Sequence, residues 1–458
     1  MLFQTLPFLL FFLIFYPVYL LLKRTRFALL WLLLASYFFY GWINPLYVIL
    51  ILYATTFDFL ISWMMQKSNR KKLYLAISII NSIGLLSFFK YADFIINNIN
   101  FLLSKLSVPY EIMSPGILLP VGLSFYLFQS ISYMVDLYRG NIERENNFIK
   151  YAAFVAFFPR LLMGPIERGK NLLPQLNQLP PVKSQDISDG LSIFIVGLFK
   201  KVAIADYLAL YVNNIYANPE QFQSPALLLA TFLFCWQIYF DFSGYTDMAR
   251  GIARLLGIRL MLNFNNPYIA TSLADFWKRW HISLSSWFKD YVYIPLGGNR
   301  KGNFNTYRNL FLTMVISGLW HGAAWTFIIW GAVHAIGSCA TRKLERTKFY
   351  QNKMPKLAKQ LLVFAFVCFA WIFFRAENID DAWLIIKRIF SSGITNPYCP
   401  ILAIVMILLV WLYQFAYESK LRRFLELKSI RIVMIISMIL YLMVFYPSRE
   451  SGFIYLVF

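Results

Sequence analysis

The residue of this sequence that most strongly suggests chemistry is a histidine inside an apolar segment. His321 lies in the run Ser317–Trp325, among glycine and alanine, near the middle of the apolar stretch 309–341. An ionisable side chain at membrane depth costs about 2.5–3.5 kcal/mol on insertion scales and is therefore a functional candidate. A neutral imidazole there can accept a proton as a general base. The alternative is a buried histidine that hydrogen-bonds a neighbouring helix.

A second histidine, His281, lies in a segment that mixes tryptophans with basic residues. Three tryptophans recur at spacings of three and seven, with three cations among them: Trp277, Trp280 and Trp287, and Lys278, Arg279 and Lys289. This spacing predicts one amphipathic helix at the membrane interface. The helix is either a headgroup anchor or the wall of a cytoplasmic entrance for an anionic substrate.

Two weaker motifs lie close by in the sequence. The run Gly297–Arg300 reads Gly-Gly-Asn-Arg. Glycine N–H groups beside a cation can hold a phosphate, but the same run is ordinary turn chemistry. Asp241 and Asp247, at the inner end of a predicted span, either orient a histidine or a basic residue or form structural pairs. The four cysteines have neither metal-site nor disulfide-framework spacing, so we expect no metal.

The composition excludes most classes of protein that could present these residues. Of 458 residues, 59% are hydrophobic and 14% are charged, and the net charge is +21. Soluble domains are nearer 45–50% apolar and about 25% charged. A soluble protein, a disordered protein and an ordinary nucleic-acid binder are therefore excluded. The sequence predicts an all-α polytopic membrane protein that forms one domain over residues 1–458.

Basic loops predict the topology, because cytoplasmic loops are enriched in Lys and Arg. Residues 23–26, 67–72 and 420–431 are such loops, so both termini are predicted to be external in the cytoplasmic (inner) membrane. About 10–12 transmembrane helices are expected. The segments 148–166 and 309–341 have basic residues on both flanks and predict re-entrant elements. The second is too short for two full spans of ~20 residues each.

Four motifs taken together resemble the membrane-bound O-acyltransferases, in the branch that O-acetylates bacterial envelope polysaccharides such as alginate and peptidoglycan. They are Asn263-Phe-Asn-Asn-Pro-Tyr, the segment 275–285, the segment 290–300, and Gly318-Leu-Trp-His-Gly-Ala, within a core of about 240–325. The element Phe158–Arg168 also resembles a family motif, with Arg160 where a glutamine is expected. The resemblance implies helices and re-entrant elements around a central funnel or tunnel.

The resemblance also implies a site. His321 would be the essential histidine and His281 the second motif histidine. The predicted substrate-binding residues are Trp280, Arg279, Trp320, Asp275, Asn299 and Arg300. The donor would be cytoplasmic acetyl-CoA, with no metal. An external esterase-fold transferase would receive the acetyl group and modify the polysaccharide, meeting the C-terminal tail at Phe453, Tyr455 and Phe458.

Other functions fit some of the same features. A related enzyme of the family moves D-alanine onto teichoic acid and shares the Trp-His-x-Ser block. A transporter or flippase would also use broken helices and a buried histidine. A scaffold that only positions a partner enzyme would tolerate the loss of His321. The positive charge would hold the inner face against anionic lipids and attract the phosphates of CoA.

Overall fold

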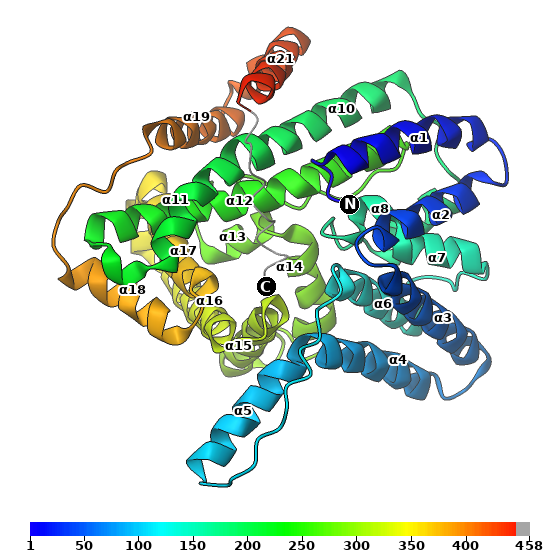
Figure 1. The fold of residues 1–458 in the computed structure, drawn as a ribbon, viewed down its shortest axis with the longest axis horizontal. Coiled ribbons are helices and arrows are strands. Elements are labelled where there is room, and N and C mark those ends of the chain that lie inside the picture. Colours follow the sequence, from blue (N-terminus) through cyan, green and yellow to red (C-terminus); the bar gives the residue numbers. More distant parts are fainter. Residues whose placement is uncertain (446–458) are drawn as a thin grey trace. The chain divides into compact units, whose positions relative to one another are not determined.

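Helices are the regular secondary structure of the range that the structure, a computed structural model, describes (Figure 1). That range is residues 1–445, and it contains no β-strand. Four helical segments are long and apolar enough to cross a membrane: Pro45–Lys67, Lys71–Lys105, Ser224–Leu255 and Lys356–Arg375. Three shorter apolar helices accompany them: Leu6–Leu22, Ala28–Gly41 and Ile401–Tyr417. The predicted all-α polytopic membrane fold is confirmed.

The first of two compact units comprises Met1–Leu191 and Ala249–Met261. Its helices are α1 (Leu6–Leu22), α2 (Ala28–Gly41), α3 (Pro45–Lys67), α4 (Lys71–Leu86), α5 (Ala92–Lys105), α6 (Leu123–Tyr138), α7 (Phe148–Ala156), α8 (Phe158–Leu161), α9 (Gly169–Asn177) and most of α10 (Ser184–Leu198). A π-helical turn, Ser87–Tyr91, joins α4 to α5.

The predicted broken element lies between α7 and α8. Every residue from 151 to 169 is buried, as interrupted backbone at membrane depth must be. The helix breaks at Phe157, where ψ is 103°. Arg160 Nη2 donates to the carbonyl oxygens of Phe154 at 3.3 Å and Val155 at 2.7 Å. The guanidinium at position 160 therefore satisfies two carbonyls that the end of α7 leaves open.

The second unit comprises Ser192–Met248 and the described part of Leu262–Phe458. Its helical elements are the π-helix Phe199–Ala205, α11 (Asp206–Ala217), most of α12 (Ser224–Leu255), α13 (Leu273–Arg279), α14 (Ile282–Phe288), α15 (Gly302–His321), α16 (Trp325–Leu344), α17 (Lys356–Arg375), α18 (Ile379–Ser391), α19 (Ile401–Tyr417), α20 (Arg422–Leu425) and α21 (Lys428–Val444). Two further π-helices, Lys289–Tyr293 and Phe349–Lys353, follow α14 and α16.

In this unit α15 and α16 form a hairpin, and α13 and α17 pack against α16. Two glycines allow the close contact between the hairpin helices. A Cβ at Gly318 would lie 2.2 Å from the carbonyl oxygen of Phe327, and one at Gly331 would lie 2.5 Å from that of Met314. The two helices are 20 residues each, longer than the apolar stretch 309–341 suggested, because their outer turns are polar.

The single amphipathic helix predicted for the tryptophan-rich segment around His281 is not present. The chain instead forms two short helices, α13 and α14, separated by a reversal at Trp280 and His281. His281 has φ of 43°, in the left-handed region that few non-glycine residues adopt. Trp280 and Trp287 are buried within the protein. A simple headgroup anchor therefore does not describe these two tryptophans.

Candidate functional site

His321 is the last residue of α15 and is buried. The chain then passes through extended Gly322 and enters α16 at Trp325. A Cβ at Gly322 would lie 2.0 Å from the ring of Phe327, so this turn requires glycine. The imidazole of His321 contacts two aromatic rings from the neighbouring helices, with centroids 5.1 Å away for Trp330 and 5.3 Å away for Phe374.

His281 caps the N-terminus of α14. Its Nδ1 accepts a hydrogen bond from the backbone N–H of Leu284 at 3.3 Å. Asn263 fixes the same turn, since its Oδ1 accepts from the backbone N–H of Ser283 at 3.1 Å and from the Ser283 hydroxyl at 2.9 Å. Complete burial lowers the pKa of His281 to about 3. The imidazole is therefore neutral at physiological pH.

The indole of Trp320 lies close to both predicted catalytic histidines. Its centroid is 4.9 Å from that of His321 and 6.2 Å from that of His281. Trp280 belongs to the same aromatic cluster through Trp371, at 5.1 Å. The structure thus gathers both histidines and two of the predicted substrate-binding tryptophans in one buried region.

A cavity of about 390 Å³ opens beside this cluster. Its walls are mostly apolar and come from α13, α14, α15 and α16, with Trp277, Leu284, Phe288 and Met314 among the lining residues. Ser317, four residues before His321, also lines it. The same lining includes three charged side chains, Lys289, Arg342 and Glu345.

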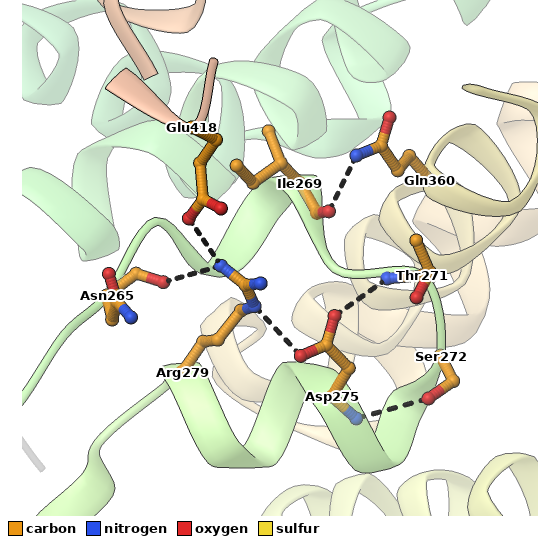
Figure 2. A network of polar contacts seen from close by, with 8 residues as sticks. All are labelled: Asn265, Ile269, Thr271, Ser272, Asp275, Arg279, Gln360 and Glu418. Atoms are coloured by element: carbon orange, nitrogen blue, oxygen red, sulfur yellow. Dashed lines mark hydrogen bonds and ion pairs between the residues drawn. The ribbon is translucent and has the colours of Figure 1, made fainter. Parts of the chain in front are cut away.

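Two predicted substrate-binding residues lie in a different environment. Figure 2 shows Arg279 held by an ion pair with Asp275 at 2.8 Å and another with Glu418 at 2.9 Å. Asp275 Oδ2 also accepts from the backbone N–H of Thr271 at 3.1 Å. This network joins α13 to the turn before it and to the end of α19. Neither Asp275 nor Arg279 lines the cavity.

Asn299 and Arg300 are exposed and follow two positive-φ glycines, Gly297 and Gly298. They also lie outside the cavity lining. The turn alternative accounts for this run. The roles predicted for Asp275, Arg279, Asn299 and Arg300 in substrate binding stay predictions.

The aspartates Asp241 and Asp247 both have basic partners. Lys201 Nζ lies 2.7 Å from Asp241 Oδ1 and 2.7 Å from Asp206 Oδ1, with only 1% of its side chain exposed. Lys200 Nζ lies 2.7 Å from Asp247 Oδ2. Both aspartates therefore pair with a basic residue, which fits the orientation of a basic side chain as well as a structural pair.

Sequence reasoning missed a third buried histidine. His334 on α16 is fully buried, with ring centroids 4.8 Å from Trp330 and 5.0 Å from Trp277. Neither of its nitrogens has a hydrogen-bond partner within residues 1–445. The membrane-depth argument applied to His321 would have identified it, because both lie in the stretch 309–341.

Two further predictions concern a metal and the C-terminal tail. Within residues 1–445 no group of three or more His, Cys, Asp or Glu side chains is arranged to hold a metal ion. Phe453, Tyr455 and Phe458, predicted to meet an external partner, lie outside the described residues.

The fold and the site define a class, a polytopic membrane protein with buried histidines beside an apolar cavity. The chain belongs to the membrane-bound O-acyltransferase family, whose profile matches residues 141–379. It is therefore an acyltransferase of the membrane.

Individual relatives are similar over most of the chain. A Pseudomonas aeruginosa protein named probable alginate O-acetylase is 40% identical over 83% of this chain and 74% of its own length. A Helicobacter pylori peptidoglycan O-acetyltransferase is 38% identical over 80% of this chain and 74% of its own length. A Bacillus subtilis teichoic acid D-alanyltransferase is 29% identical over 56% of this chain and 69% of its own length.

Proposed function

We propose that this protein takes an acetyl group from cytoplasmic acetyl-CoA and passes it across the inner membrane to an external esterase-fold transferase, which O-acetylates an envelope polysaccharide. The relatives named for O-acetylation match 80–83% of the chain at 38–40% identity. The D-alanyltransferase matches 56% at 29% identity. Acetyl transfer is therefore favoured over D-alanyl transfer.

The observation that carries the proposal is the cavity beside the histidines. Its charged lining residues Lys289 and Arg342 suit the phosphates of CoA, and its apolar walls suit a narrow arm that ends in a thioester. Ser317 brings the lining within one helical turn of His321. The proposal also requires an orientation in the membrane in which the basic loops face the cytoplasm and both termini are external.

His321 carries the chemistry in this proposal. As a general base it takes the proton of the attacking hydroxyl while the hydroxyl oxygen forms a bond to the thioester carbonyl carbon. The carbon–sulfur bond then breaks, and the CoA thiolate leaves and takes up a proton. As a relay, the imidazole itself accepts and passes on the acetyl group. Burial among aromatic rings limits competing hydrolysis in either case.

Purified protein in liposomes with labelled acetyl-CoA tests the proposal. We expect CoA release and transfer of label to an external acceptor by the wild type, and neither by a folded His321→Ala variant. His281→Asn should be assayed alongside, because asparagine also tolerates the left-handed conformation of position 281. Equal activity of wild type and His321→Ala would exclude His321 from the reaction. A preference for a D-alanyl thioester over acetyl-CoA would instead support the second candidate function.

A further inference from the structure

The α15–α16 hairpin also forms a second, open cavity, here called the groove. It shares no lining residue with the cavity beside the histidines. It has a volume of about 560 Å³ and lies between one face of α15 and one face of α16. Its apolar wall includes Phe304, Phe311 and Ile336, of which Phe304 is 79% exposed and Ile336 is 63% exposed. Such exposure of large apolar side chains on a membrane protein is typical of a surface that faces lipid.

Two cations, Arg308 and Lys343, line this groove. Arg308 donates from Nε at 3.3 Å and from Nη2 at 3.1 Å to Oδ1 of Asn309. Asn309 in turn donates to the carbonyl oxygen of Gly298 at 3.0 Å, which holds the amide in place. Across the groove, Lys343 Nζ lies 5.9 Å from the centre of the Tyr307 ring. Each helix thus supplies one cation beside an apolar wall.

The chain around these cations is strongly basic. The stretches 300–308 and 342–348 together hold seven Lys or Arg and one Glu. Clusters of four to eight basic residues next to a membrane-spanning helix attract anionic lipid headgroups, with about 1 kcal/mol for each residue near the surface. The charge therefore favours an anionic occupant over a neutral one, and the apolar wall favours one with a hydrocarbon chain.

We propose that this groove binds an anionic phospholipid. Its phosphate lies between Arg308 and Lys343, and an acyl chain runs along Phe311 and Ile336. The inference does not rest on the proposed acetyl transfer. It does concern the helix that ends at His321, because the groove is formed by the same hairpin. A lipid that bridges α15 and α16 stabilises the arrangement in which His321 is held.

A matched pair of double variants tests the site. Arg308→Gln/Lys343→Gln removes the two groove cations, and Arg346→Gln/Lys348→Gln removes two cations of the same stretch that do not line the groove. Phosphatidylglycerol should raise the melting temperature of purified wild-type protein in neutral detergent, whereas phosphatidylcholine should not. We expect the groove variant to bind phosphatidylglycerol at least about tenfold more weakly than the wild type, and the control variant to bind it nearly as the wild type does. Equal weakening in both variants would overturn the proposal in favour of diffuse surface charge.

Cys339 gives a second measurement that needs no substitution, since it lies in the groove and is partly accessible. Phosphatidylglycerol should slow alkylation of Cys339, mapped by peptide mass spectrometry, and leave the exposed Cys399 unaffected. Unchanged alkylation of Cys339 would overturn the proposal. So would protection by acetyl-CoA in the absence of lipid, which would make the groove a donor site, or protection that rises with protein concentration, which would make it a contact between copies.

Discussion

The imidazole of His321 meets the indole of Trp330 edge to face, with ring centroids 5.1 Å apart and planes at 83°. Trp330 is fully buried and also stacks on Trp371, with centroids 5.7 Å apart. The orientation of His321 therefore depends on a packed aromatic surface.

Truncation of Trp330 should show whether this residue orients the His321 ring or binds acetyl-CoA. Trp330→Ala leaves a large void, which typically costs about 3–5 kcal/mol, and frees the His321 ring to rotate. We expect a lower melting temperature and a fall in kcat with little change in KM for acetyl-CoA. Trp330→Phe keeps an aromatic ring and should retain most activity. A rise in KM with unchanged kcat would show that Trp330 contacts the donor instead.

Arg279 provides a test of whether a predicted substrate-binding residue acts through the fold. Because its ion pairs go to Asp275 and Glu418 (Figure 2), Arg279→Gln should lower the melting temperature and leave KM for acetyl-CoA unchanged. Arg342→Gln, which alters the cavity lining, should raise KM instead. Steady-state kinetics of the two variants show whether Arg279 binds the donor or only supports the fold. A higher KM for Arg279→Gln would support the predicted role of Arg279 in binding.

The buried lysine Lys201 should be far more important for stability than its neighbour Lys200. Lys201→Met leaves Asp206 and Asp241 without their shared cation, and the loss of one partner from a buried pair typically costs about 3–5 kcal/mol. Lys200 is 23% exposed and pairs with Asp247 alone, so Lys200→Met should cost less. Thermal unfolding in detergent measures both. Similar melting temperatures for the two variants would contradict this ranking.

The sequence predicted the helical membrane fold, because composition is a local property. Its motifs also singled out His281 and His321, whose catalytic roles stay predictions. It did not predict the partners of those residues. The tryptophan spacing of three and seven indicated one helix, yet the left-handed conformation of His281 divides it. A left-handed histidine has no distinctive signal in a single sequence.

Partners that are distant in the chain were also beyond sequence reasoning. The Sγ atoms of Cys235 and Cys368 lie 3.0 Å apart although 133 positions separate them. Both are free cysteines, and their spacing in the sequence does not indicate this contact. Lys201 likewise finds Asp241 only through the packing of two helices, where Gly197 and Gly244 allow close approach. Such contacts depend on tertiary packing, which spacing does not encode.

The neutral state of His281 predicts a pH dependence of stability. Burial lowers its pKa to about 3 in the folded protein, while an unfolded histidine titrates near 6.5. Below about pH 6.5 the His281 imidazole binds a proton in the unfolded chain but not in the folded chain. The free energy of unfolding therefore falls as the pH is lowered toward 3. His281→Asn removes this group, and its melting temperature should fall less steeply between pH 7 and 5. Parallel curves for wild type and variant would show that His281 is not buried as a neutral base.

The cavity beside His321 predicts how a change in its shape should affect catalysis. Ser317 lines the cavity one turn of α15 from His321, so a larger side chain there should obstruct a thioester approaching the imidazole. Ser317→Leu adds volume to a packed region, which typically costs about 1–3 kcal/mol, and we expect a folded protein with strongly reduced CoA release. Ser317→Ala keeps the cavity open and should remain active. CoA release measured against acetyl-CoA concentration distinguishes the two Ser317 variants. Full activity of Ser317→Leu would mean that the donor reaches His321 by another route.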